Sequence, residues 1–437
     1  MDADLDTLAR VLELVVTRVP GSRVELGERC LSPLGSRRGG RVGGGDEMFI
    51  TGRRLFDGRA PEVRENWGVE VEAGRIVEVG PAPGAGADVV DLGDVTLLPG
   101  LVDVHQHLVF DASDDPVGHL RASDDAALLE QMAGAAQRAL AVGITTIQDL
   151  GDRGYLALTL RDRFRHGDEV GPRIVASGPP LTVTGGHCWF LGGEADGEAG
   201  VRQAVRDRVA HGVDVVKIMA TGGNLTPTVG PHESQYTHTE IAAAVEEAHA
   251  HGLPLAVHAH GPQGIVDALA AGADSIEHCT FFTADGVDAD PAVLDQLASS
   301  GTTISMTGAI LPGMAPPIAA MRQRLGAIRA NHAALFRAGA RIVCSSDAGV
   351  TATKPHDVLP HGVSGFLSAI GMTSAQALVA TTALAAEVCG VADVAGTLEP
   401  GKDADILAVA GDPLADITAI HDVVAVYARG RQAVGPA

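Results

Sequence analysis

The sequence predicts an α/β protein, a (β/α)8 TIM-type barrel with a small discontinuous β-sandwich domain formed by N- and C-terminal segments. Strand and helix patterns alternate in eight units over residues 98–395. Histidines and other polar residues recur where several of these strands end. Short strand patterns separated by turns bracket this region at 47–97 and 396–437. A doubly wound open sheet is the alternative, and candidate ligands at the ends of several different strands favour the barrel.

The chain begins with residues 1–46, which we expect to be an N-terminal extension. Apolar residues recur at helical spacing over Asp2–Val19, which predicts a short amphipathic helix. Residues 20–46 are rich in Gly, Arg and Ser and predict a linker. The extension indicates no function of its own.

The barrel prediction depends on a series of strand and helix patterns. The expected strands are Gly100–His107, Thr145–Leu150, Arg173–Ser177, Val213–Ala220, Pro254–His260, Ser275–Cys279, Thr302–Thr307 and Arg341–Ser346. The expected helices are Ala126–Ala141, Ala157–Arg165, Gly197–Ala210, Thr239–His251, Gly264–Ala271, Pro291–Ser299, Ala319–Ala338 and Ser374–Val388. A glycine follows many of these helices where a left-handed C-cap is expected, as at Gly212 and Gly272.

Composition limits the classes of function. The 437 residues are 46% hydrophobic and carry a net charge of −23, which disfavours nucleic acid and anionic membranes as partners. The five cysteines are scattered without a C-x-x-C pair, which favours a reducing, cytoplasmic setting. No apolar run is long enough to span a membrane, and no signal-peptide pattern starts the chain. We expect a small-molecule substrate. A homo-oligomer is possible, because the sequence does not determine the oligomeric state.

Two histidines end the first barrel strand. His105 and His107 lie two residues apart on a strand with apolar flanks, so they project to the same face. Either histidine alone reads as structural. The pair instead indicates half of a metal site, because further ligand types end later strands.

Lys217 on the fourth strand shares its face with Val213 and Val215, so it points into the barrel if they do. Burial lowers the pKa of a lysine, and a neutral amine can add carbon dioxide to become a carbamate that bridges two metal ions. The alternative is a lysine paired with a carboxylate such as Asp214 or Asp347. Spacing alone leaves these two interpretations even.

Further ligand types end three later strands: His258 and His260 the fifth, His278 the sixth, and Asp347 the eighth. A chance arrangement would rarely place histidines at the ends of three strands and an aspartate at the end of a fourth. This set of nitrogen and oxygen ligands suits a divalent ion, zinc above all.

These motifs resemble the metal-dependent amidohydrolase superfamily, in particular its imidazolonepropionase-like and Xaa-Pro-dipeptidase-like branch. The resemblance runs from about Met48 to the C-terminus. It rests on PGLVDVHQH (99–107), TGGHCWFLGG (184–193), VDVVKIMATGG (213–223), VHAHG (257–261), SIEHC (275–279), SSDAG (345–349) and GTLEPGKDADILAV (396–409). The motif at 184–193 departs from the branch, which has Gly-Gly-His-Gly where this chain has Gly-Gly-His-Cys-Trp-Phe.

The resemblance implies a site with two metal ions per chain. One ion would be held by His105, His107 and Asp347. The other would be held by His258 and His278, with carboxylated Lys217 bridging the two. Asp347 would also be the general base.

The resemblance further implies residues that contact the substrate. His187 and Tyr236 match positions that face substrate in the branch. His260, the extra member of its pair, is expected to lie behind the ligands of the second ion or to contact the substrate. The ions are expected to be zinc, and other divalent metals are allowed.

The predicted reaction is hydrolysis of a C–N bond, of the amide, peptide or cyclic amide type, by metal-bound hydroxide with Asp347 as the base. A carbamate, ester or lactone substrate is an alternative, because the same hydroxide attacks those carbonyls. A second alternative is a mononuclear deaminase of a heterocycle, although the acid expected shortly after His260 is missing. A non-catalytic scaffold is the third, and intact ligands at all six positions disfavour it.

The loops after strands 1, 3, 7 and 8 are expected to set specificity, and they span 111–118, 185–193, 308–317 and 350–362. Aromatic and apolar residues in them indicate a partly apolar pocket. Four basic residues could bind a carboxylate of the substrate. The alternative interpretation is that each of them is a solvated group on the protein surface. These candidates are Arg153, Arg322, Lys354 and His361.

Overall fold

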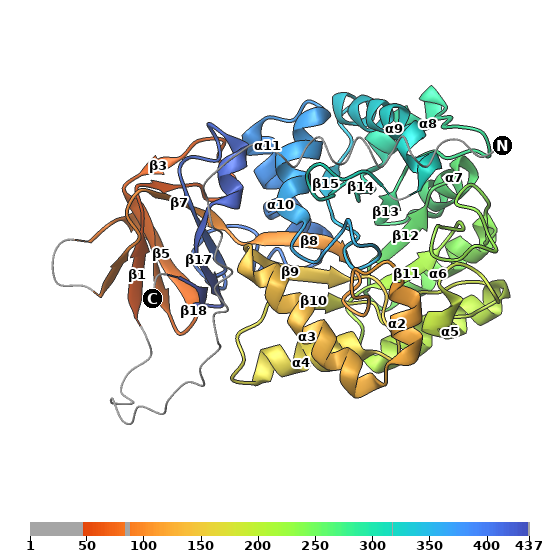
Figure 1. Ribbon diagram of the computed structural model, residues 1–437, viewed down its shortest axis with the longest axis horizontal. Helices are drawn as coiled ribbons and strands as arrows, with labels where there is room; N and C mark the ends of the chain where they lie inside the picture. The colour runs from red at the N-terminus through yellow and green to blue at the C-terminus, as the bar shows by residue number, and fades with distance from the viewer. Residues whose placement is uncertain (1–46, 84–87, 317, 436–437) are drawn as a thin grey trace, which may run out of the picture. The chain divides into compact units, whose positions relative to one another are not determined.

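The computed structural model describes residues 47–83, 88–316 and 318–435 (Figure 1). The helix and linker expected within residues 1–46 lie outside these ranges. In the described residues, strands and helices alternate along the chain, so the predicted α/β class is confirmed.

Parallel strands form the central part of the structure. They are β8 (Leu101–Gln106), β9 (Ile144–Asp149), β10 (Arg173–Ala176), β11 (Val216–Met219), β12 (Leu255–Ala259), β13 (Ser275–His278), β14 (Thr303–Met306) and β15 (Ile342–Cys344). One sheet has the order β10-β9-β8 and the other β11-β12-β13-β14-β15, with parallel pairing throughout. Two isolated parallel bridges continue the pairing, from Gln106 to Ala348 and from Leu181 to Ile218. The carboxyl ends of all these strands therefore lie on one side.

Helices alternate with these strands. They are α2 (Pro116–Ala122), α3 (Asp125–Ala141), α4 (Leu156–His166), α5 (Gly197–His211), α6 (His238–Ala250), α7 (Pro262–Ala271), α8 (Pro291–Ser300), α9 (Ala319–Arg337), α10 (Leu359–His361), α11 (Ser374–Ala380) and α12 (Ala383–Val388). Short 3-10 segments lie at Trp189–Leu191 and Ile417–His421, and a π-helical turn at Gly362–Leu367. Local chemistry sets several ends. Thr237 and Glu240 form a capping box at the start of α6, and Gly212 ends α5 in the left-handed conformation.

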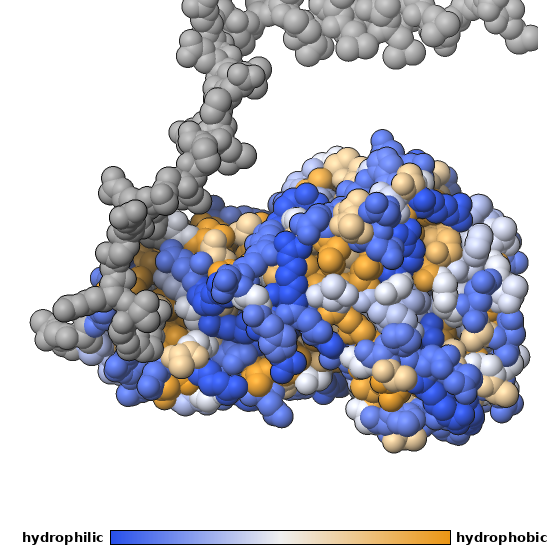
Figure 2. Space-filling model, turned by 90° about the horizontal axis from the view of Figure 1, so that it is seen from below, coloured by the Kyte–Doolittle hydropathy of each residue, from blue (hydrophilic) through white to orange (hydrophobic). Residues whose placement is uncertain are grey.

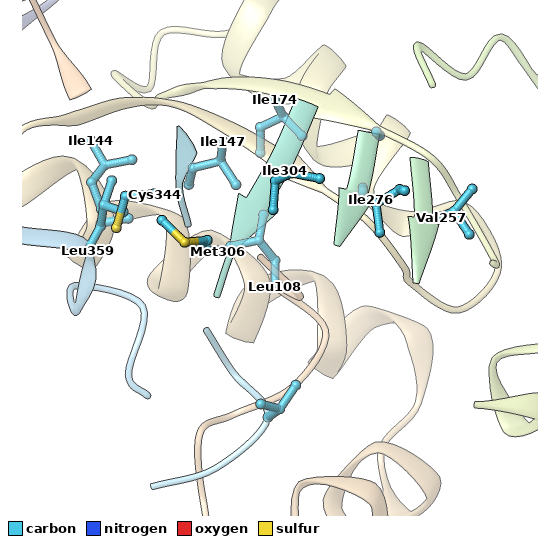
Figure 3. Close-up of a cluster of buried hydrophobic side chains, with 14 of the residues drawn as sticks. Leu108, Ile144, Ile147, Ile174, Val257, Ile276, Ile304, Met306, Cys344 and Leu359 are labelled. Carbon is cyan, nitrogen blue, oxygen red and sulfur yellow. The ribbon is translucent and has the colours of Figure 1, made fainter. Parts of the chain in front are cut away.

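Apolar side chains pack on both faces of the parallel strands. Val257, Ile276 and Ile304 lie in the larger buried cluster, which also includes helical residues (Figure 3). A second cluster contains Val102, Val104, Val215, Ala256 and Val343. Because strand residues alternate between faces, Ala256 and His258 of β12 share the face opposite Val257.

Strands from both ends of the described chain share one sheet. Its order is β18 (Arg431–Val434), β17 (Val423–Ala428), β16 (Ile406–Ala410), β7 (Val95–Pro99), β2 (Arg54–Leu55) and β3 (Arg64–Glu65). A smaller sheet has the order β5 (Arg75–Pro81), β4 (Trp67–Glu72), β1 (Met48–Thr51) and β6 (Val89–Asp91). In Figure 1, β17 and β18 lie beside the strands of residues 48–99. Arg173 of β10 forms ion pairs with Asp403 and Asp405, which ties β10 to the segment that leads into β16.

The surface mixes polar and apolar side chains. On the face drawn in Figure 2, hydrophobic patches are separated by hydrophilic ones. Among the described residues, no helix combines the length and the hydropathy needed to cross a membrane. A few large hydrophobic side chains are exposed, and two of them, Met314 and Ile318, border the cavity described below.

Candidate active site

The first group of candidate ligands joins the end of β8 to the segment after β15. The ligand atoms of His105, His107 and Asp347 all lie within 4.8 Å of one another. The β8–β9 register shifts between Asp103 and Gln106, just where the two histidines leave the regular strand pattern. The backbone N–H of Asp347 donates to the carbonyl of His105 at 2.8 Å, which holds the two segments together. The structure thus brings together the three residues predicted to hold the first ion.

Each imidazole of this group is oriented by an acceptor on its Nδ1. For His105 this acceptor is the Glu277 carboxylate at 2.7 Å, and for His107 it is the Gly151 carbonyl at 3.2 Å. An ionised carboxylate and a carbonyl only accept, so the ring protons lie on Nδ1 and the Nε2 atoms are bare. These two Nε2 atoms are 3.2 Å apart, and each lies 3.5 Å from Asp347 Oδ1. Three lone-pair acceptors therefore face one another.

The second group contains three imidazoles, His258, His260 and His278, whose ligand atoms also lie within 4.8 Å of one another. His258 Nε2 donates to the carbonyl of Gly222 at 3.0 Å, which leaves its Nδ1 as the ligand atom. The other two rings have Nδ1 against a threonine hydroxyl, Thr280 Oγ1 at 2.9 Å for His260 and Thr307 Oγ1 at 2.7 Å for His278. Their Nε2 atoms remain for a ligand. The structure therefore places His260 together with His258 and His278, the two histidines predicted to hold the second ion, rather than in a layer behind them.

Lys217 lies beside both groups on β11. Its side chain is fully buried, and among the described residues its Nζ has no hydrogen-bond partner. Asp214, one of the two carboxylates considered for pairing, instead accepts from Arg161 at 2.9 Å. Burial lowers the pKa of Lys217 to about 8, against the raising effect of nearby carboxylates, Glu277 first. About a tenth of the amine is therefore neutral at pH 7, far more than for a lysine with the ordinary pKa of about 10.4.

Burial also keeps the imidazoles neutral. It lowers the pKa of His105, His258 and His278 well below the ordinary value, with repulsion from neighbouring basic groups adding to the effect. The same cause lowers the pKa of His187 and of His260 to about 3. A metal ion binds neutral imidazole, so these rings are ready to act as ligands at neutral pH.

The donor set fits divalent metal ions. Zinc–nitrogen bonds of about 2.0–2.1 Å in a tetrahedral arrangement place neighbouring ligand atoms about 3.3–3.4 Å apart. The separations between His105 Nε2, His107 Nε2 and Asp347 Oδ1 are 3.2–3.5 Å. A cation between these atoms would remove the repulsion of their lone pairs, and the unpartnered Lys217 Nζ provides a further position for an anionic bridge.

Both groups open into one cavity of about 390 Å³, which is within the size range of small-molecule sites. Its walls come from Leu225, from the loop that follows β14, from one side of α9, from Val350–Lys354 and from Phe366. The predicted loops after strands 3, 7 and 8 thus contribute. Residues 111–118 do not appear among the described lining residues.

The remaining predicted residues divide into two groups. His187 lines the cavity, with its ring centroid 4.8 Å from that of His258. Gly223 allows this position, because a side chain there would collide with the His187 ring. Tyr236 does not line the cavity: it is buried, and its hydroxyl donates to the carbonyl of Ala195 at 2.7 Å. The geometry therefore gives no support to its predicted contact with substrate.

The candidate carboxylate-binding residues also divide. Arg322 and Lys354 line the cavity. Arg153 donates to the carbonyls of Leu120 and Ser123 and pairs with Asp125, so it has a structural role at the end of α2. His361 stacks on another imidazole and lies outside the described lining.

Sequence reasoning missed two residues of the site, Glu277 and His332, and one contact of Lys354. Glu277 accepts a hydrogen bond from His105, and its position directly before His278 in SIEHC was the available signal. His332 of α9 lines the cavity and interacts through Nε2 with the carbonyls of His278 and Cys279, both at 3.2 Å. Lys354 places its Nζ 3.5 Å from Asp347 Oδ2 while donating to two backbone carbonyls, a contact that no local pattern indicates.

Comparison with known proteins agrees with this geometry. The profile of the amidohydrolase family matches residues 96–433, which is most of the chain. The chain belongs to the amidohydrolase family. This assignment covers the parallel strands, both groups of candidate ligands and the C-terminal strands.

Individual family relatives support the predicted branch. Ochratoxinase of Aspergillus niger is 28% identical over 383 residues, covering 78% of this chain and 76% of the relative. Imidazolonepropionase of Brucella suis is 27% identical over 381 residues, covering 77% and 85%. A crystal structure of a Xaa-Pro dipeptidase with bound methionine superposes with a TM-score of 0.77 at 28% identity, covering 89% of this chain and 99% of that one. The predicted superfamily and branch are therefore confirmed, and the family contains hydrolases of amide- and peptide-type bonds.

Proposed function

We propose that this amidohydrolase cleaves an amide, peptide-type or cyclic amide C–N bond of a small molecule, using two divalent metal ions, zinc first among them. The observation that carries this proposal is the meeting of bare acceptor atoms. His105 Nε2, His107 Nε2 and Asp347 Oδ1 face one another within 3.5 Å at the carboxyl ends of parallel strands. The family match supports hydrolysis of a C–N bond as the chemistry.

The scaffold we propose is a closed (β/α)8 barrel over residues 98–395. The bridges Gln106–Ala348 and Leu181–Ile218, which join the two parallel sheets at both edges, support closure. Residues 47–97 and 396–437 would form a small β-sandwich domain, since β7 and β16 pair in the sheet that both ends share. Sites in such barrels lie at the carboxyl ends of the strands, where both imidazole groups are found.

Residues from both groups would hold the ions. His105, His107 and Asp347 would bind the first ion, and His258 and His278 the second. A carbamate formed on Lys217 would bridge them: its neutral amine would form an N–C bond to carbon dioxide and release a proton. When bound, the ions would lower the pKa of a water molecule and polarise the scissile carbonyl.

Asp347 is placed to move the proton. Its Oδ1 lies among the ligand atoms, and its Oδ2 lies 3.5 Å from the Lys354 ammonium, which fixes the carboxylate in the cavity. Asp347 would take the proton of the attacking water and transfer it to the leaving nitrogen. His187 lies against His258 in the cavity wall and would contact the substrate.

The setting we propose is a cytoplasmic enzyme with a small-molecule substrate. The net charge of −23 supports the exclusion of nucleic acid as a partner. The size of the cavity, about 390 Å³, supports a small molecule over a protein substrate.

Metal counting combined with a substrate screen tests the proposal. The protein is stripped with a chelator, reloaded with Zn²⁺, and analysed by elemental mass spectrometry. We expect about two ions per chain. Loaded and stripped protein are then incubated with N-acyl amino acids, dipeptides and lactams, and products are identified by mass spectrometry.

A double variant His105→Ala/His107→Ala serves as the control, because it removes the paired imidazoles of the first group. The proposal predicts that this variant loses one ion and all turnover. One ion per chain in the unmodified protein, with release of ammonia from a heterocycle, would favour the deaminase alternative. A protein that takes up no metal would overturn the proposal.

A further inference from the structure

The cavity has one apolar wall that the catalytic residues do not explain. Met321, Leu325 and Ile328 lie on one side of α9 at helical spacing, and all three line the cavity. Phe366 extends this wall. None of these side chains bears a group that could bind a metal ion or transfer a proton.

Two further apolar side chains lie at the edge of this wall and remain partly exposed. Met314 is 47% exposed and Ile318 is 37% exposed, and both line the cavity. Few large hydrophobic side chains among the described residues are this exposed. When a ligand covers apolar surface inside a site, that surface is removed from water, which favours binding of the ligand.

The charged side chains that line the cavity also restrict the kind of substrate. Asp347 is the sole carboxylate among the described lining residues, and it faces the candidate ligands and Lys354. The lining includes the basic side chains of Lys354 and Arg329, the latter lying over the Phe366 ring at 5.8 Å. Because that carboxylate is already engaged, the described lining has no other carboxylate to pair with a cationic substrate, and the basic groups would repel such a substrate.

We infer that the substrate is an amide that carries a bulky aromatic or branched aliphatic group, packed against α9, and that bears no positive charge. This inference rests on the proposed function, because it assumes that the scissile bond lies at the imidazole groups. The apolar wall formed by Met321, Leu325, Ile328 and Phe366 would bind the bulky group. The basic lining tolerates a neutral or anionic remainder.

A matched set of amides tests both parts of the inference with the zinc-loaded protein. N-acetylglycine is compared with N-(4-phenylbutanoyl)glycine, and N-acetylglycine amides of small amines with those of phenethylamine, so that the bulky group is tried on each side of the bond. We expect at least a tenfold higher kcat/KM for the bulky member of one pair, since one methylene in an apolar pocket is worth about 10-fold or more.

Charge is tested on a constant acyl group. The 4-phenylbutanoyl amides of glycine, ethanolamine and ethylenediamine are anionic, neutral and cationic at neutral pH. We expect the cationic amide to have a kcat/KM at least tenfold below that of both others. A cationic amide that is cleaved as well as the neutral one would overturn the charge part of the inference.

Two variants locate the preference on α9. Leu325→Gln places an amide in the apolar wall, and Ala327→Gln makes the same change at an exposed position of the same helix outside the lining. We expect Leu325→Gln to lower kcat/KM for the bulky amide about tenfold more than it lowers kcat/KM for the acetyl amide. Ala327→Gln should change neither. Met321→Gln repeats the test if Leu325→Gln fails to fold by circular dichroism.

The outcomes separate the inference from the function on which it rests. If no amide is hydrolysed by the two-metal protein, the proposed function fails. If small amides are hydrolysed and bulk brings no advantage on either side of the bond, the function stands and the inference is wrong. An equal loss in Leu325→Gln for bulky and acetyl amides would also contradict it, since that result indicates a general defect.

Discussion

Glu277 offers a sharp test of how the first group of ligands is held. Its carboxylate is fully buried, accepts from His105 Nδ1 at 2.7 Å, and receives the Ser275 hydroxyl at 2.7 Å on its other oxygen. Burial raises the pKa of Glu277, against the lowering effect of Lys217. An acceptor on the far nitrogen of a ligating imidazole fixes the ring and raises its basicity, so we predict that Glu277 strengthens binding of the first ion.

The size of the effect follows from what replaces the carboxylate. In Glu277→Ala, His105 Nδ1 loses its acceptor, and loss of such a partner weakens metal binding about 10–100-fold, or about 1.4–2.7 kcal/mol. In Glu277→Gln, the amide can turn its oxygen to His105 while its nitrogen meets the Ser275 hydroxyl, which can accept. This variant keeps a neutral hydrogen bond, so we expect a loss near the lower limit, about 10-fold.

Competition with a fluorescent zinc chelator measures the affinity of each variant, and elemental mass spectrometry reports the number of ions. Ser275→Ala is the matched control, because it removes one of the serine hydrogen bonds to Glu277 and leaves the contact with His105 in place. We expect that control to bind zinc within about threefold of the unmodified protein. The reasoning is refuted if Glu277→Ala also binds within threefold, or if the alanine and glutamine variants do not differ.

Three other predictions concern single residues of the site. Asp347→Asn should lower kcat about 10²–10⁴-fold while metal content by elemental mass spectrometry stays near normal, and a variant that keeps most of its kcat would remove Asp347 from the role of base. Lys217→Ala should lose the second ion and regain part of its turnover with added short carboxylic acids, and full two-metal occupancy would contradict the bridge. Burial lowers the pKa of His332 to about 4 in the folded state, below the unfolded value of about 6.5. The metal-free protein should therefore lose up to about 3 kcal/mol of stability as pH falls from 6.5 to 4, measured by urea unfolding, whereas His332→Gln should lack this part of the slope.

Much of the parallel part of the fold could be predicted from local patterns. Buried parallel strands have near-continuous apolar sequences, and the left-handed conformation that ends many helices favours glycine, as Gly212 and Gly272 show with φ of 79° and 81°. Strand alternation also placed His105 and His107 on one face, and their Nε2 atoms are 3.2 Å apart. These signals lie within a few residues of each other, so they survive without knowledge of the tertiary structure.

Other site positions could not be derived from alternation. His278 follows Glu277 on β13, so a regular strand would turn its side chain to the face of Ile276, away from the cavity. Instead His278 has φ of 71° and Asp347 has φ of 56°, left-handed values that are costly for residues other than glycine. Only the surrounding packing holds such a conformation, and a motif can report it where periodicity cannot.

The wall of α9 shows a second limit. Met321, Leu325 and Ile328 have the spacing of any helix that faces a core, and the sequence alone does not distinguish a core-facing stripe from a cavity wall. The same holds for Tyr236, whose sequence context suggested a substrate contact while its hydroxyl is satisfied by the Ala195 carbonyl. In both cases the decisive fact is which empty space the side chain borders, a property of tertiary packing.

The features that mark the site as functional are also the ones that cost stability. Lys217 Nζ is buried with no hydrogen-bond partner among the described residues, and bare acceptor atoms of His105 and His107 meet at 3.2 Å. A fold under selection for stability alone would replace such groups with apolar side chains. Two left-handed residues add backbone strain at the same place. Bound cations would offset these costs together. They would coordinate the facing lone pairs and balance the negative charge of the carbamate proposed on Lys217. The number and position of the destabilising groups therefore support metal binding at this site more strongly than any single distance does.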